Sequence, residues 1–195
     1  MIKSALQSSL TNDVKYRSMS VGNVPSSEYL IQTIEVGATP VASVTFDVSA
    51  FAGVYRHLQI QIVGRSTATN TDGRFAFLRF NGDSGSNYSN HGLWGQNGSV
   101  ASYFGADTGI YIQRFNSDAN TAGAFGVASI DILDAFQTTK NKTVRGLGGR
   151  TTDQAGIYLT SAAWRNNAAL TGFTLGPETG NWVAGTRISL YGVTA

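Results

Sequence analysis

The residue types that most often carry catalysis are few in this chain. His57 and His91 are its two histidines; His57 alternates outward in a predicted strand, and His91 lies in a Gly- and Asn-rich segment without Asp or Glu close in sequence. Metal binding needs clustered ligands, and general-base catalysis needs a base that a third group orients. We therefore assign neither histidine to a metal site or a catalytic site.

Asp131 and Asp134 offer a pair of carboxylates, the arrangement that glycoside hydrolysis uses. A spacing of three places the two side chains on opposite faces of a strand. Asp134 also stands where the strand should end, which favours a role in a turn. The sequence thus nominates no catalytic residue and no cofactor, and we expect a protein that is not an enzyme.

Asn81, Asp83 and Asn87, with Gly82 and Gly85, resemble part of an oxygen-rich calcium loop. The bidentate Glu that such a loop requires is missing downstream. Asn, Asp and Gly are also the usual residues of tight turns. We interpret the segment as a turn and assign no metal to it.

Trp94 and Tyr103 are the candidates for contact with a glycan. An aromatic ring can stack on a sugar because it combines apolar area with a polar edge. Packing in the core or in a subunit interface is the alternative for both side chains.

The composition favours association through shape and hydrogen bonds rather than through charge. Only 13% of the 195 residues are charged, against about 25% in an average domain, and 23 residues are Gly. The 14 basic and 12 acidic residues leave a net charge of +2, which is too small and too scattered to attract nucleic acid. The densest basic segment, 140–150, predicts a solvated hairpin.

Cysteine is absent, which excludes disulfides, thiolate metal sites and Cys nucleophiles. The first ten residues lack the continuous apolar region of a signal peptide, and no later run approaches the length that spans a bilayer. We expect no membrane insertion and a protein that is made in the cytoplasm and stays there unless a particle carries it out.

The segment 1–28 differs from the rest of the chain. Ile2, Leu6, Leu10 and Val14 recur every four residues among polar ones, which gives one narrow apolar ridge on a short helix. So sparse a ridge does not support an isolated helix in water, and a Gly/Pro/Ser linker follows it. The pattern predicts an extended N-terminal arm and linker that dock on neighbouring subunits, with the body of the same chain as the alternative.

From residue 29 the apolar period becomes two, which indicates strands. We predict one all-β domain over 29–195, a jelly-roll-like antiparallel β-sandwich of about ten strands, with an up-and-down barrel as the second choice. Asp72-Gly73 and Asn81-Gly82 are hairpin signals, and 83–108 and 116–123 are the expected long loops. The predicted strands are 29–36, 41–48, 55–63, 74–80, 109–115, 124–133, 142–148, 156–164, 171–175 and 186–193.

Several short segments together resemble the recurring landmarks of a group of tailed-bacteriophage virion structural proteins. They are YLIQTI (29–34), YRHLQI (55–60), RFNGDSGSNY (79–88), KTVR (142–145), WR (164–165) and SLYGV (189–193). These landmarks are turns and core strands rather than catalytic signatures, and the resemblance spans roughly 29–195.

The resemblance implies a β-sandwich displayed on a phage particle, made in the host cytoplasm and then located in the virion. A capsid-surface decoration or cement protein is the favoured version, and a tail fibre, adaptor or receptor-binding module is its alternative. The implied partners are major capsid or tail proteins and further copies of the chain, with a trimer favoured and a host surface glycan as a further candidate. A free carbohydrate-binding module is the alternative of another class.

Overall fold

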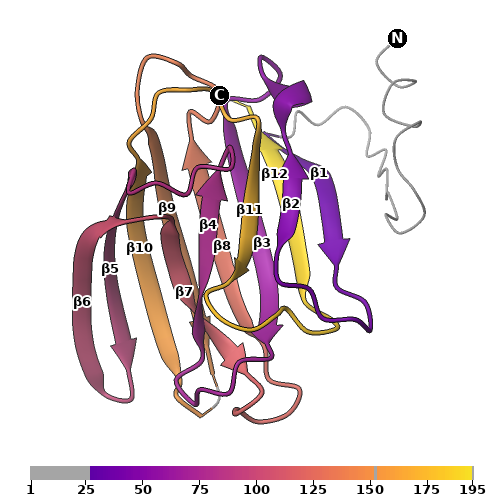
Figure 1. The fold of residues 1–195 in the computed structure, drawn as a ribbon, viewed down its shortest axis with the longest axis vertical. Coiled ribbons are helices and arrows are strands. Elements are labelled where there is room, and N and C mark those ends of the chain that lie inside the picture. Colours follow the sequence, from indigo (N-terminus) through magenta and orange to yellow (C-terminus); the bar gives the residue numbers. More distant parts are fainter. Residues whose placement is uncertain (1–26, 152, 195) are drawn as a thin grey trace.

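The computed structural model describes residues 27–151 and 153–194, almost entirely as strands and turns (Figure 1). One short 3-10 helix, η1 (Ser49–Phe51), interrupts them. The strands are β1 (Glu28–Glu35), β2 (Val44–Asp47), β3 (His57–Ser66), β4 (Arg74–Phe80), β5 (Tyr88–Gln96), β6 (Ser99–Asp107), β7 (Ile110–Ser117), β8 (Gly126–Leu133), β9 (Lys142–Arg150), β10 (Gly156–Trp164), β11 (Gly172–Pro177) and β12 (Arg187–Val193).

The strands form two facing sheets. The larger has the order β1-β12-β3-β8-β9-β10-β5-β6 and the smaller the order β2-β11-β4-β7, and all their pairings are antiparallel. A short parallel contact, in which Arg65 pairs with Asn116, joins β3 to β7 and connects the two sheets. In Figure 1 the smaller sheet lies in front of the larger one.

This order is that of a jelly roll with two added hairpins. Without β5–β6 and β9–β10, the chain alternates between a β1-β12-β3-β8 sheet and a β2-β11-β4-β7 sheet, except at β4 and β7, which are consecutive and paired; this is the double Greek key of that fold. The hairpins β9–β10 and β5–β6 continue the first sheet beyond β8. The predicted all-β, jelly-roll-like sandwich is therefore confirmed.

The core fills the space between the sheets. Strand residues of alternating position face it, so that Leu58, Ile60 and Ile62 of β3 oppose Leu78 and Phe80 of β4, and all five are buried. Period-two burial of aliphatic and aromatic side chains is what makes each of these segments a strand rather than a helix.

All ten predicted strands are present, but the expected long loop 83–108 is wrong. It contains only a short turn before β5 and β6, a hairpin in which Tyr88 pairs with Asp107. The hairpin turns at Asn97-Gly98, where both residues have positive φ, 50° and 78°. Such a pair is typical of a two-residue hairpin turn, and it raises the number of described strands to twelve.

The two predicted hairpin signals are turns, but neither joins paired strands. Gly73 and Asn81 have positive φ as expected, 69° and 50°. However, β3 and β4, and likewise β4 and β5, belong to different sheets and share no ladder. Each turn therefore carries the chain across the sandwich. The predicted arm residues Ile2, Leu6, Leu10 and Val14 lie outside the described residues.

Candidate docking surface

The two histidines do not come together. In the larger sheet three strands lie between His57 on β3 and His91 on β5. His57 Nδ1 accepts a hydrogen bond of 2.8 Å from the main-chain N–H of Asp134, whose carboxylate contacts Arg56 and Lys140. The hydrogen bond from Lys140, followed by that from Arg56, lowers the pKa of Asp134 to about 2. These contacts fasten the turn after β8.

Asp131 and Asp134 also have separate surroundings. Asp131 lies on the outer side of the larger sheet, where Gln59 Nε2 and Arg145 Nε donate to its carboxylate at 2.9 and 2.7 Å. Asp134 follows the strand, with a left-handed backbone at φ 50°. Each carboxylate thus has structural partners of its own, in keeping with the turn interpretation of Asp134.

The Asn81–Asn87 segment holds its own shape through Asp83. The carboxylate of Asp83 accepts hydrogen bonds from Trp164 Nε1 at 2.7 Å, Gly85 N at 2.8 Å and Asn87 Nδ2. The bond from Trp164 is the largest of the effects that lower the pKa of Asp83. No group of three or more His, Cys, Asp or Glu side chains placed to hold a metal ion occurs within 27–151 and 153–194.

The basic segment 140–150 is not a solvated hairpin throughout. Lys142 is buried, and its Nζ donates to the main-chain oxygens of Gln137, Lys140 and Asn167. Arg150 is also buried, at 2% exposure. Much of the positive charge of this segment is therefore unavailable to a partner.

Trp94 and Tyr103 lie side by side on β5 and β6, with ring centroids 5.6 Å apart. Tyr103 covers Gly92, where a Cβ atom would lie 2.1 Å from the tyrosine ring, and its hydroxyl donates to the main-chain oxygen of Tyr111. Burial raises the pKa of Tyr103 to about 12. Both rings turn toward the smaller sheet, and their contact with a glycan remains a prediction.

The most unusual surface is the outer face of the larger sheet, meaning the side chains that point away from the sandwich core. Leu147 of β9 pairs with Leu159 of β10, and Leu159 with Leu93 of β5. These three side chains, the leucine row, are 52%, 50% and 46% exposed. Single exposed leucines are ordinary on proteins, but a contiguous row marks a binding surface.

A second apolar row runs parallel to the leucine row. Val127 of β8, Ile157 of β10 and Val100 of β6 occupy one line across the sheet, and all three are more than half exposed. Gly149 and Gly95 fill the positions on either side of Ile157. Because glycine has no side chain, the flanks of Ile157 are bare.

A groove of about 1010 Å³ follows from this arrangement. It crosses the outer face from β1 to β10, with Leu30, Tyr191, Leu147 and Ile157 among its lining residues. Within the described chain nothing fills it. Its size and apolar walls suit a protein or ligand surface of complementary shape.

The outer face carries little free charge over its apolar half. Arg145 and Asp131 neutralise each other across β9 and β8. The line of the leucine row continues across the sheet onto β8, β3 and β1, which are strands of the eight-stranded jelly roll. There the corresponding outward residues are polar: Ser129, Gln61 and Thr33. The leucine row is thus confined to the added hairpins, while Leu30 of β1 and Val127 of β8 are exposed apolar residues on the jelly-roll strands.

This surface was not predicted from the sequence. The sequence signal for this surface is that Leu147, Ile157 and Leu159 occupy outward positions on strands whose inward side chains, among them Val144 and Tyr158, are already buried. An apolar residue on both faces of a strand indicates burial on both faces. Gly156–Trp164 shows that pattern, whereas Leu93 and Val100 lie in the segment 83–108, for which the sequence predicts a loop.

Two of the segments on which the resemblance rests lie together in the structure. The RFNGDSGSNY and WR segments meet, because Trp164 binds Asp83 and the main-chain N–H of Arg165 donates to Asn87 O at 2.7 Å. No protein-family model, curated protein or solved structure matches the chain. Within the described residues, no helix is long and apolar enough to cross a bilayer.

Proposed function

We propose that this chain is a non-enzymatic structural component of a tailed-phage virion that assembles with further copies of itself through the outer face of the larger sheet. The observation that carries the assembly role is the leucine row, three half-exposed leucines in register on adjacent strands. The placement in a virion is supported by the resemblance of the turn and strand landmarks.

The dimensions of the outer face support a second copy as its occupant. Eight strands about 4.8 Å apart and about nine residues long cover about 38 by 30 Å, or about 1,100 Å². A stable interface buries about 800 Å² on each partner. The face is therefore large enough for a specific contact without help from the rest of the molecule.

The charge distribution also supports a second copy. A surface that meets its own copy must avoid placing like charges opposite each other. The apolar half of the outer face meets this condition, because Arg145 and Asp131 form a closed pair within one subunit. A capsid protein or tail protein would then bind elsewhere on the oligomer.

Decoration of the capsid surface is the version of the virion role that we favour, with a tail fibre or adaptor as its alternative. The test is immunogold electron microscopy of purified particles, with an antibody raised against residues 29–195 and shown to bind the native fold. Gold on heads supports decoration, and gold on tails supports the adaptor role. Unlabelled particles that also lack the chain by mass spectrometry would overturn the virion assignment.

A further inference from the structure

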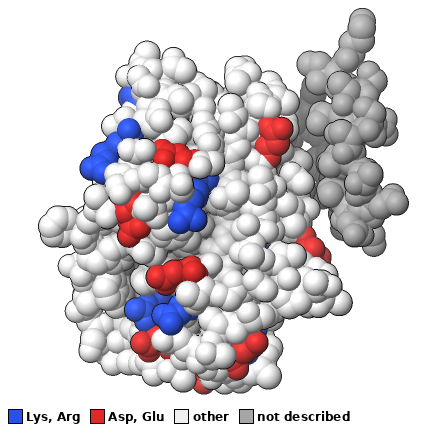
Figure 2. Space-filling view, viewed as in Figure 1, with Lys and Arg blue, Asp and Glu red and all other residues white. Residues whose placement is uncertain are grey.

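The opposite side of the molecule, the outer surface of the smaller sheet, carries a second hollow. This cleft has a volume of about 360 Å³ and draws its lining from β4, β7, β11 and the end of β6. Phe77, Arg79, Asp107, Tyr111 and Glu178 are the lining residues with aromatic or charged side chains. Figure 2 looks onto this side and shows acidic and basic side chains close together over the part where β4 and β7 run.

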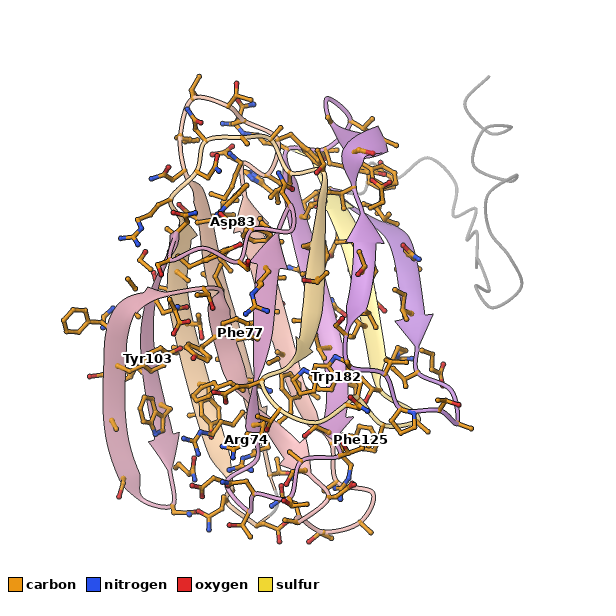
Figure 3. The ribbon with its side chains drawn as sticks, viewed as in Figure 1. Arg74, Phe77, Asp83, Tyr103, Phe125 and Trp182 are labelled. Atoms are coloured by element: carbon orange, nitrogen blue, oxygen red, sulfur yellow. The ribbon has the colours of Figure 1, made fainter. Side chains whose placement is uncertain are left out.

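Aromatic rings form part of the cleft lining. Phe77 and Tyr111 are cross-strand partners on β4 and β7, and their ring centroids lie 4.9 Å apart. Phe75 and Tyr103 continue the aromatic cluster, at 5.2 and 6.2 Å from Tyr111. Figure 3 shows Phe77 and Tyr103 at the same level of the sandwich, where the β5–β6 hairpin lies beside β7. Rings fixed in this way present apolar area at little entropic cost.

The guanidinium of Arg79 is held in place beside the aromatic rings. It lies 4.5 Å from the centroid of the Phe77 ring, and Nε donates to Thr108 O at 2.9 Å. Nη2 approaches the Thr108 hydroxyl at 3.3 Å. Within the described chain Nη1 has no acceptor, so a positioned N–H donor is left for a ligand.

Two carboxylates supply acceptors. Asp107 Oδ1 accepts a hydrogen bond of 2.6 Å from Thr108 N, and burial, followed by the negative charge of Asp107, raises the pKa of the Tyr111 hydroxyl to about 12. Glu178 is exposed, its main-chain N–H is fixed to Phe75 O at 2.8 Å, and its carboxylate has no partner among the described residues. The cleft therefore offers free acceptor capacity next to a free donor.

From this juxtaposition we infer that the cleft binds a neutral saccharide. Sugars combine apolar C–H faces, which pack on aromatic rings, with adjacent hydroxyls that each donate and accept hydrogen bonds. Two carboxylates against one guanidinium make the cleft net negative, which disfavours phosphate and acidic sugars. The volume lies at the small end of ligand pockets and suits one or two sugar rings. This site does not depend on the proposed assembly role.

The test is calorimetry of the full chain with lactose, cellobiose and N,N′-diacetylchitobiose, with sialyllactose as the acidic comparison. We expect binding of at least one neutral disaccharide, unchanged by EDTA. The variants Glu178→Gln and Asp107→Asn should each weaken that binding about 10-fold or more, because each replaces a charged acceptor. Glu35→Gln, on the edge strand β1, is the matched control and should bind like the natural chain.

Glu178→Gln keeps the experiment decisive, since this exposed side chain has no partner in the described fold and its loss should not affect folding. Thermal unfolding of each variant checks that point. The inference is overturned if none of the three neutral disaccharides binds at about 10 mM. It is also overturned if both variants bind as tightly as the natural chain, or if EDTA abolishes binding, which would indicate a metal site instead.

Discussion

A chain with Thr in place of Leu93, Leu147 and Leu159 is expected to self-associate about 100-fold more weakly than the natural chain. The three leucines lie in register on the adjacent strands β9, β10 and β5 of the outer face. Threonine is a good strand former and is smaller and more polar, so the sheet should persist while the apolar row is lost. The perturbation therefore affects association more than folding.

The magnitude follows from the exposure of the side chains. Complete burial of a leucine contributes about 1.5–3 kcal/mol, and these three are 46–52% exposed, so covering the remainder contributes about 1 kcal/mol each. In a two-fold symmetric contact six such side chains contribute about 6 kcal/mol. Threonine keeps a methyl group, so we expect to lose about half of this, and 3 kcal/mol is about 100-fold in Kd.

Sedimentation equilibrium over a range of concentrations measures this change directly. Val54→Thr is the matched control, because Val54 is 58% exposed but lies in the turn before β3, away from the outer face. Urea unfolding of both variants checks that the fold is retained. A natural chain that stays monomeric at about 1 mM, or a triple variant with a Kd within about twofold of the natural one, would refute the reasoning.

Three further predictions concern the scaffold. Asp83→Asn removes the charged acceptor that holds the turn before β5. Allowing for solvent screening, we expect it to lower the free energy of unfolding at pH 7 by about 1–2 kcal/mol, as measured by urea titration. Gly148→Ala should cost about 1–3 kcal/mol in the same assay, because the new Cβ would lie 1.8 Å from Gln113 Oε1, whereas Gly105→Ala, with open space around it, should cost less than about 1 kcal/mol. The pKa of Asp134 is about 2 in the folded protein and about 3.9 in the unfolded chain, so the stability that its ionised carboxylate contributes is present above pH 4 and is lost as the pH falls towards 2. In Asp134→Asn, the free energy of unfolding should therefore fall less steeply over this pH range.

Alternating patterns predicted strands well because burial on one face of a sheet leaves a clear period of two. Leu58-Gln-Ile-Gln-Ile62 shows it plainly, and β4 and β10 begin and end at the predicted residues. The β5–β6 hairpin was missed because its strands hold Gly, Ser, Asn and Ala at many positions, which weakens the apolar period. The Asn97-Gly98 turn was the local signal that could have located it.

Local sequence signals could not predict which strands pair with each other or which side chains meet across the fold. Asp72-Gly73 and Asn81-Gly82 reverse the chain, yet a turn does not determine whether the next strand pairs with the previous one or crosses to the other sheet. The burial of Lys142 was equally hidden, because its ammonium group donates not only to the nearby main-chain oxygens of Gln137 and Lys140 but also to that of Asn167, 25 residues away. Long-range geometry decides such cases, whereas composition suggests only a basic surface.

The position of the apolar surface in the fold is itself an argument for function. A jelly roll is complete with β1-β12-β3-β8 and β2-β11-β4-β7, and its outward residues in the line of the leucine row are polar. The leucine row lies wholly on the added hairpins β9–β10 and β5–β6, whereas Leu30 of β1 and Val127 of β8 add exposed apolar side chains on the jelly-roll strands. Outward leucines bury little area within the subunit, so folding alone does not account for them.

The added hairpins also connect the two candidate surfaces. Leu93 of β5 faces the outer side of the larger sheet, whereas Tyr103 and Asp107 of β6 reach toward the cleft on the smaller sheet. The β5–β6 hairpin, one insertion into the eight-stranded jelly roll, thus supplies apolar area to the outer face of the larger sheet and polar and aromatic groups to the cleft. If the triple leucine variant becomes monomeric yet binds disaccharide unchanged, the two surfaces act independently. A parallel loss of both activities in a folded variant would mean that assembly positions the β5–β6 hairpin for the cleft.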